Sequence, residues 1–324
     1  MLVKLAVAVI ALAGLNTVQA VAEPLAQDDA LRILERISTA ARSLNYEGTF
    51  VYQHDERVET SRIVHFVDTD GEHEKLETLD GPRREIIRNN DEVQCYYPDA
   101  KVVRSQKRVV QRSFPALLPD QLNSITEFYN VRKGRAKRIA GYDSQAVILE
   151  PKDGLRYGHM LWAESDSGLL LKALTLNESR QVVEQFAFTQ LNIGEGVTRA
   201  MISPSYNATE PGWRVDQFAH AQINAGDSNW AVRDLPPGFR KILQMQRTRQ
   251  GGRVSVTHMV YSDGMAAVSI FIESMPRHAV NSGLTRQGAI NIYRRAVGDT
   301  LVTVLGEAPA ATVIRFGNSV SFQE

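Results

Sequence analysis

Arginine side chains on short predicted strands are the groups in this sequence best suited to binding chemistry, because a guanidinium pairs with phosphate through two parallel hydrogen bonds. The chain holds 37 Lys and Arg against 37 Asp and Glu, but their distribution is uneven. Residues 55–92 carry twelve acidic and six basic residues, 101–138 carry ten basic and two acidic, and 240–253 carry five basic and no acidic residues. Such clusters attract anions, although any single one is also typical of a solvated sheet face. The arginines that we expect to bind an anionic headgroup are Arg83, Arg84, Arg104 and Arg108.

Catalytic motifs are missing from the sequence. It contains no glycine-x-serine-x-glycine nucleophile elbow and no phosphate-binding glycine loop. None of the seven histidines has a partner at the spacing that places two ligands on one helix face. His159 and His258 fall in predicted strands, where a hydrogen-bonded histidine is more common than a metal ligand. The sequence does not decide whether two carboxylates converge in a cleft, as a glycosidase requires. We therefore expect a binding protein with no catalytic residues, no metal and no cofactor.

The N-terminus reads as a cleaved export signal. Lys4 precedes an apolar run over residues 5–15, and the small residues Ala20 and Ala22 fit the small-x-small cleavage rule. A membrane anchor is less favoured, because spanning a bilayer takes about 20 apolar residues. We expect residues 1–22 to be removed, which leaves a soluble protein outside the cytoplasm and makes nucleic acid an unsuitable partner.

Cys95 is the only cysteine, so the chain can form no internal disulfide, and no cysteine follows the cleavage site to carry a lipid anchor. Cys95 lies in a strand-like run at 93–97, where a buried small side chain is more common than a reactive thiol. About 300 mature residues favour two domains over one.

Periodicity predicts a helix, then a long antiparallel meander. Apolar spacing predicts a helix at 30–42 behind Asp28 or Asp29. Alternating or β-branched runs with turn residues between them predict strands, and a 3.6-residue period at 119–129 predicts a second helix. The predicted strands are 46–53, 61–67, 84–88, 93–97, 101–104, 108–110, 131–139, 144–150, 157–163, 169–176 and 181–189.

Residues 192–212 contain glycines and prolines with few large apolar side chains, which predicts a linker. Beyond it we expect a smaller domain with strands at 240–247, 254–261, 266–273, 288–296 and 300–305 and a terminal helix at 308–316.

A strongly curved antiparallel sheet closed by helices can enclose an apolar cavity with a few polar groups at its mouth. Pattern alone favours an ordinary packed core over such a cavity. The side chains of one strand parity that we expect to line it are Phe50, Tyr52, Tyr96, Leu161, Leu170 and Phe186.

Several short motifs occur in order along the predicted mature chain. They are SLNYEGTF at 43–50, DGPRRE at 80–85, DGLRY at 153–157, LW at 161–162, GLLLK at 168–172, EQF at 184–186, LPPGF at 235–239 and YSDG at 261–264. Their order and spacing resemble the MucB/RseB family of periplasmic regulators, including its alginate-regulating branch, and the resemblance covers essentially the whole mature chain.

The resemblance implies an α+β protein of two domains. Residues 23–192 would form a domain similar to the lipoprotein carriers LolA and LolB, an incomplete β-barrel closed by helices around a hydrophobic cavity. Residues 193–213 would be a linker, and 214–324 a small domain with a sheet and a helix. With this resemblance, the cavity becomes the favoured interpretation.

The resemblance also implies a function. A protein of this family binds the periplasmic part of a single-pass anti-sigma factor of the MucA or RseA type and shields it from regulated proteolysis. Lipid or lipopolysaccharide fragments release it, which frees an extracytoplasmic sigma factor. The alternatives are a periplasmic lipid or lipoprotein carrier and an enzyme acting on envelope polymer. Sequence locates no contacts to the anti-sigma factor and does not decide whether the protein forms a homo-oligomer.

Overall fold

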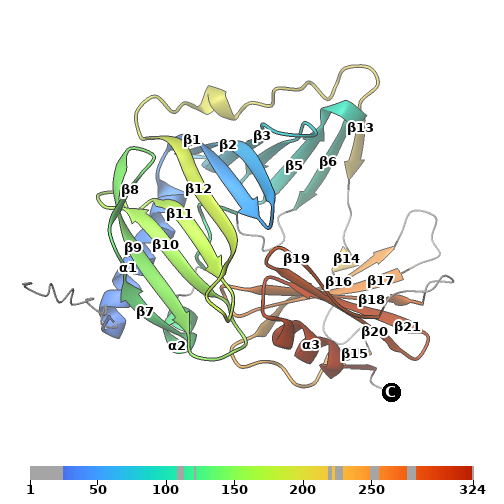
Figure 1. Ribbon diagram of the computed structural model, residues 1–324. Coiled ribbons are helices and arrows are strands. Elements are labelled where there is room, and N and C mark those ends of the chain that lie inside the picture. The colour runs from blue at the N-terminus through green and yellow to red at the C-terminus, as the bar shows by residue number, and fades with distance from the viewer. Residues whose placement is uncertain are drawn as a thin grey trace, which may run out of the picture.

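The computed structural model describes residues 25–107, 113–119, 122–217, 221–222, 229–248, 255–275 and 282–322. Two large sheets dominate these residues, one above the other in Figure 1. The predicted signal at 1–22, the predicted strand at 108–110 and Arg108 lie outside the described residues. No helix in the described ranges is long and apolar enough to cross a membrane.

The first sheet is open, strongly curved and has thirteen strands (Figure 1). Its order is β13-β6-β5-β4-β3-β2-β1-β12-β11-β10-β9-β7, with β8 paired to β9. Among the strand pairs of the described residues in this sheet, β13–β6 alone is parallel. The predicted α+β class with a large curved antiparallel sheet is therefore confirmed. The strands are β1 (Tyr46–His54), β2 (Arg57–Asp68), β3 (Gly71–Thr78), β4 (Glu85–Asn89), β5 (Glu92–Tyr97), β6 (Val102–Lys107), β7 (Tyr129–Lys133), β8 (Lys137–Ile139), β9 (Tyr142–Pro151), β10 (Gly158–Glu164), β11 (Leu170–Leu176), β12 (Val182–Ile193) and β13 (Arg214–Gln217).

Curvature is marked at the centre of this sheet, where β1 meets β12. The register between them shifts between Thr49 and Phe50, and such a bulge increases local bending and twist. Gly48 precedes the bulge, and a Cβ there would lie 2.5 Å from the backbone oxygen of Gln190. Glycine is therefore required for the close approach of the two strands.

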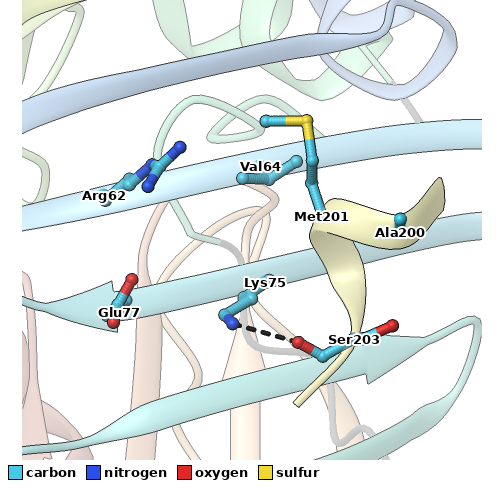
Figure 2. A pocket seen from close by; sticks show the side chains of 7 residues that line it. All are labelled: Arg62, Val64, Lys75, Glu77, Ala200, Met201 and Ser203. Atoms are coloured by element: carbon cyan, nitrogen blue, oxygen red, sulfur yellow. Dashed lines mark hydrogen bonds between the residues drawn. The ribbon is translucent and has the colours of Figure 1, made fainter. Parts of the chain in front are cut away.

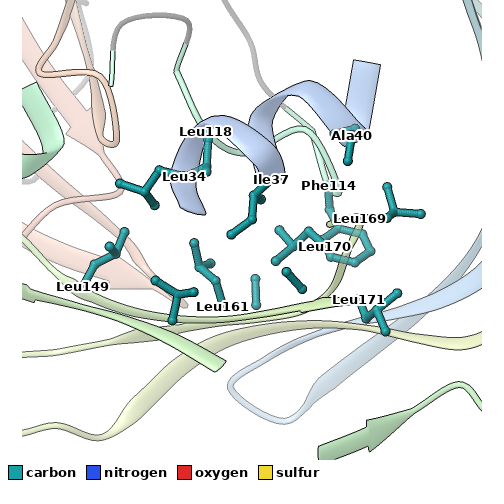
Figure 3. Packing of buried hydrophobic residues seen from close by; sticks show 14 of the residues in the cluster. Leu34, Ile37, Ala40, Phe114, Leu118, Leu149, Leu161, Leu169, Leu170 and Leu171 are labelled. Carbon is teal, nitrogen blue, oxygen red and sulfur yellow. The ribbon is translucent and has the colours of Figure 1, made fainter. Parts of the chain in front are cut away.

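Helix α1 (Gln27–Ser43) packs on the concave face of this sheet. Leu34 and Ile37 recur at helical spacing and are almost fully buried. Figure 3 shows Ile37 pointing toward Leu161 and Leu170, with Leu34 on the side of Leu149 and Phe114 beside Leu170. The helix predicted at 30–42 is thus confirmed.

The helix predicted at 119–129 is shorter in the structure. Helix α2 covers only Asn123–Phe128, and Tyr129 is already extended and opens β7. The strand predicted at 131–139 is two strands, because the chain breaks at Gly134, where Ala146 and Ile148 would crowd any Cβ.

Residues 194–213, here called the strap, run along the convex face of the first sheet. The short 3-10 helix η2 (Arg199–Ile202) places Ile202 in a cluster with Val64 and Tyr96. Lys75 anchors the strap by donating from Nζ to the Ser203 carbonyl at 3.0 Å. The strap ends in β13, so 214–217 belong to the large sheet although they follow the predicted linker. The domain boundaries stay predictions.

The second sheet has seven strands in the order β14-β16-β17-β18-β21-β20-β19. Helix α3 (Ala310–Ser319) packs on it through Val313 and Phe316, close to the helix predicted at 308–316. The short strands β14, β15, β19 and β22 were not expected from the sequence. The strands are β14 (Ala221–Gln222), β16 (Arg240–Thr248), β17 (Ser255–Ser262), β18 (Ala267–Ser274), β19 (Gly283–Gln287), β20 (Ile290–Val297) and β21 (Thr300–Gly306), with β15 (Trp230–Val232) paired separately to β22 (Val320–Phe322).

Candidate functional site

A cavity of about 480 Å³ lies where the concave face of the first sheet meets the second sheet. The first sheet contributes side chains from β1, β2, β3, β10, β11 and β12. The second contributes side chains from the turn after β17 and from the strands β18, β20 and β21. Both structural units are therefore needed to form the walls.

Aromatic rings form one wall of the cavity. Tyr52 stacks on Phe186 with ring centroids 4.5 Å apart. Phe114 stacks on the same Phe186 at 5.4 Å and meets Phe50 at 5.2 Å. Alternation along β1 and β12 places Phe50, Tyr52 and Phe186 on one face of the sheet, and Phe114 reaches the same face from the segment that precedes α2. The result is a continuous apolar surface of the kind that binds acyl chains or rings.

Four of the six side chains predicted to line a cavity do line this one: Phe50, Tyr52, Leu161 and Phe186. Tyr96 does not, because β5 turns it to the convex face, where its ring lies 6.2 Å from Trp213. Leu170 does not either, because it is fully buried in the cluster with α1. The ligand role of the four stays a prediction.

The three predicted headgroup arginines in the described residues, Arg83, Arg84 and Arg104, do not come together, and the fourth, Arg108, lies outside those residues. Arg84 lines the cavity. Arg83 is exposed and paired with Asp99, Nη2 to Oδ1 at 2.6 Å. The Arg104 guanidinium lies 5.0 Å from the centre of the Tyr97 ring. The structure therefore supports one of these side chains as a cavity residue.

Two carboxylates that sequence reasoning missed face the same cavity. Glu184 accepts hydrogen bonds from the Tyr52 hydroxyl at 2.8 Å and the Thr175 hydroxyl at 3.2 Å. Burial raises the pKa of Glu184. Glu307 enters the cavity from the second domain, and its side chain is exposed to solvent there. The surrounding protein atoms displace part of the water around its carboxyl group, and this partial desolvation, together with the charge of Glu184, raises its pKa to about 7. Burial also lowers the pKa of His159 to about 4.

One sequence signal could have located Glu184: it lies two residues before Phe186 on β12, so both side chains are on the same face of the strand. Glu307 offered none, because the chain leaves β21 one residue before it and its approach to Glu184 depends on how the two domains meet. The polar part of the cavity is thus a product of tertiary structure.

Arg156 joins the two domains. It is 1% exposed, its Nε donates to Asp263 Oδ2 at 2.7 Å, and its other nitrogens donate to the Asp153 carboxylate and the Pro237 carbonyl. Its guanidinium lies 4.1 Å from the centre of the Phe128 ring. The motifs at 153–157, 235–239 and 261–264 therefore meet at one buried cation.

Further hydrogen bonds cross between the domains at other points. Asn291 Nδ2 donates to the Tyr157 hydroxyl, and the Gly288 amide donates to Asp55, both at 2.8 Å. Thr312 donates to the Leu155 carbonyl at 2.7 Å. Polar contacts thus fix the second domain beside the cavity.

A smaller hollow of about 260 Å³ lies under the strap on the convex face. Figure 2 shows Arg62 and Val64 beside Met201, and Lys75 below them with a hydrogen bond to Ser203. Both of its basic groups are engaged within the protein: Lys75 pairs with Glu85 at 3.0 Å and Arg62 with Glu47 at 2.9 Å. It is a weaker candidate for a ligand.

Groups suited to metal or thiol chemistry are few. In the described part of the chain, no three His, Cys, Asp or Glu residues come together in a way that could hold a metal ion. Burial raises the pKa of the Cys95 thiol, which lowers its fraction of reactive thiolate.

Comparisons with known proteins agree across both domains. The model of the MucB/RseB N-terminal domain matches residues 29–206, and that of the MucB/RseB C-terminal domain matches residues 224–321. The sigma factor AlgU regulatory protein MucB of Pseudomonas aeruginosa is 31% identical over 299 residues, 90% of each chain. The sigma-E factor regulatory protein RseB of Haemophilus influenzae is 25% identical over 290 residues, again 90% of each chain.

Solved structures give the same result. MucB in complex with MucA(peri) matches with a TM-score of 0.71 and 28% identity, over 91% of this chain and all of that one. A crystal structure of MucB matches with a TM-score of 0.67 over 91% of this chain and 98% of that chain, also at 28% identity.

Proposed function

This chain belongs to the MucB/RseB family, and we propose that it is a periplasmic negative regulator of an extracytoplasmic-function sigma factor. It binds the periplasmic part of a membrane anti-sigma factor of the MucA or RseA type and protects it from regulated proteolysis. The observation that carries the proposal is the similarity, over 91% of this chain, to MucB in its complex with MucA(peri).

The cavity supports an amphiphile, such as a lipid or lipopolysaccharide fragment, as the releasing signal. Its volume of about 480 Å³ falls within the range of about 300–1,000 Å³ that is usual for small-molecule sites. We assign the apolar part of the ligand to Phe50, Tyr52, Leu161 and Phe186, and place Arg84 at the mouth.

Release follows from where the cavity lies. Its walls come from both domains, so an amphiphile that enters it alters how the domains fit together. An anti-sigma segment that binds one arrangement of the domains is then weakened by the ligand, and the coupling must be reciprocal.

A protection assay tests the proposal. The purified protein is mixed with the periplasmic segment of the anti-sigma factor from the same organism, and cleavage of that segment by a site-specific protease is followed with and without lipid A. We expect protection that lipid A removes. The variant Phe186→Ser should keep protection but respond less to lipid A, whereas Phe322→Ser, an exposed phenylalanine outside the cavity, should behave as wild type. Failure to protect the segment at all contradicts the proposal.

The proposal places the protein in the periplasm after removal of residues 1–22 and includes no catalytic step, metal or cofactor. Fractionation of cells that produce the full chain tests the location. A family of named sigma-factor regulators supports a binding role.

The cavity also favours a second function, a carrier of lipid or lipoprotein with no signalling partner. Isolation of the protein from periplasm with its bound partners separates the two. A regulator brings an anti-sigma protein, whereas a carrier brings lipid and a membrane acceptor.

A further inference from the structure

The end of the first sheet around β8 carries an unusually basic run. Five of the seven residues at 132–138 are Lys or Arg, and none is acidic. Arg135, Lys137 and Arg138 are exposed. Within the described residues, no carboxylate oxygen lies within 4.0 Å of their charged nitrogens. Asp143 lies opposite Arg138 in the ladder and offsets part of this charge at longer range.

Lys137 of β8 and Lys172 of the neighbouring part of the sheet, on β11, both contact the ring of Trp162. Lys137 Nζ lies 5.3 Å and Lys172 Nζ 5.7 Å from the centre of the Trp162 ring, within the range of a cation–π contact. Trp162 is 3% exposed, and its indole N–H has no hydrogen-bond partner among the described residues. Burial and the charge of Lys137 lower the pKa of Lys172. An anion close to both ammonium groups would relieve their repulsion.

The pairing of β10 with β11 places Trp162 and Lys172 on the convex face of the sheet. Trp162 lies opposite Lys172 in the β10–β11 ladder, whereas the adjacent pair of Leu161 and Ala173 lines the cavity on the concave face. Strand β9 runs from its pairing with β8 over roughly 30 Å toward Asp153, which pairs with the interdomain residue Arg156. The cluster therefore lies on the other face of the sheet from the cavity and away from the second domain (Figure 1).

Three other arginines of the described residues are neutralised locally by aspartate. Bidentate or close pairs with aspartate, each with a shortest contact of 2.6 Å, are Arg83 with Asp99, Arg199 with Asp68 and Asp70, and Arg315 with Asp234. Arg135, Lys137 and Arg138 have no such carboxylate partner among the described residues, so their charge is available to an external anion.

We propose that the basic edge, defined as Arg135, Lys137, Arg138 and Lys172, docks on the anionic headgroup surface of a phospholipid bilayer. Its side chains spread over β8, the turn before it and β11 instead of converging on a hollow. That arrangement suits a broad field of phosphates and not one bound ion. With the edge against a bilayer, the cavity on the opposite face stays open to its ligand. This inference does not depend on the proposed regulatory function.

Sedimentation with vesicles tests the proposal. Wild-type protein and the variant Lys137→Gln/Arg138→Gln/Lys172→Gln are mixed with vesicles of phosphatidylglycerol and phosphatidylcholine, or of phosphatidylcholine alone. Each lysine or arginine at such a surface strengthens binding about fivefold, so we expect the variant to bind the anionic vesicles about 100-fold more weakly. Binding should also weaken above physiological salt, where the screening length falls below ~8 Å.

A charge-matched control is Arg83→Gln/Arg199→Gln/Arg315→Gln, which removes three positive charges elsewhere. We expect it to bind as wild type, and thermal melting checks that both variants are folded. The proposal would be overturned if both variants lost affinity for anionic vesicles equally, or if the first variant bound them as tightly as the wild-type protein. It would also be overturned if the wild-type protein bound pure phosphatidylcholine vesicles as tightly as anionic ones. Displacement by inorganic phosphate, but not by chloride of equal ionic strength, would show a small-ion site and overturn it too.

Discussion

The concave face of the first sheet is covered in two different ways. Where α1 covers it, Leu34 and Ile37 pack against Leu170, and the hollow beside Ile37 measures only about 140 Å³. Where the second domain covers it, a cavity of about 480 Å³ remains beside Phe186. A helix can place its apolar stripe directly on a sheet, whereas a separately folded sheet is held here by polar contacts at its margin. The fold thus combines a packed half and an open half in one sheet.

Removal of Arg156, the main polar contact between the two domains, should have the largest effect on the free energy of unfolding. Arg156→Ala leaves the Asp263 carboxylate, which is 4% exposed, without its charged partner. We expect a loss of about 4 kcal/mol in the free energy of unfolding. Urea denaturation measures it, with Arg199→Ala as the exposed-pair control, expected to cost less than about 1 kcal/mol. Equal costs for the two variants would show that Arg156 does not hold the domains.

The packed half should be sensitive to the loss of side-chain volume. Leu34→Ala removes a fully buried side chain beneath α1 and should cost about 3 kcal/mol, because the surrounding structure only partly fills the space. Leu284→Ala, at a position 44% exposed, should change stability by less than about 0.5 kcal/mol. The same denaturation assay compares them, and a similar small effect at Leu34 would contradict the packing described.

The open half should tolerate a similar change better. Phe186 borders the cavity, whereas Phe188, two residues along the same strand, is 3% exposed and not among the cavity-lining residues. Phe188→Ala should cost about 4 kcal/mol and Phe186→Ala about 2 kcal/mol. Thermal or urea unfolding of the pair measures the difference. A cost at Phe186 that equals or exceeds that at Phe188 would mean that the cavity is closed in solution.

A smaller effect concerns pH. The Glu307 carboxyl group has a pKa of about 7 in the folded protein and about 4.5 in the unfolded chain, so it holds its proton more tightly when the protein is folded. Its contribution therefore favours folding below about pH 4.5 and is lost as the pH rises to about 7. Glu307→Gln should remove this decline, so the variant should gain stability relative to wild type at pH 8 and not at pH 4.

Carbon-13 NMR of the glutamate carboxyls provides a direct check of the same group. In Glu184→Gln the pKa of Glu307 should fall, because one of the two causes of its rise is the charge of Glu184. An unchanged titration of Glu307 in that variant would show that the two carboxylates do not face each other.

Local sequence patterns predicted much of the first domain. Helical spacing from Ala30 to Ala41 predicted α1, and alternation along β1 placed Phe50 and Tyr52 on one face, which is the cavity face. These features depend on neighbours within a few residues, which a period of 3.6 or 2 describes directly.

Features set by distant contacts could not be predicted in this way. Alternation does not say which face of a curved sheet a strand turns inward, so Tyr96 was expected in the cavity and lies on the convex face. The strap was predicted to be a linker because it contains few large apolar side chains. Those it has, such as Ile202, are buried on the convex face, and the strap leads into β13, which pairs with β6. The approach of Glu307 to Glu184 requires the assembled domains.

Calorimetry of the proposed anti-sigma segment, with and without saturating lipid A, tests the central claim most directly. That claim is that the open half of the sheet is a ligand site coupled to partner binding. We expect lipid A to weaken the binding of the segment at least about tenfold, a coupling of about 1.4 kcal/mol, and Phe186→Ser to reduce that coupling. An affinity for the segment that lipid A leaves unchanged would contradict the account.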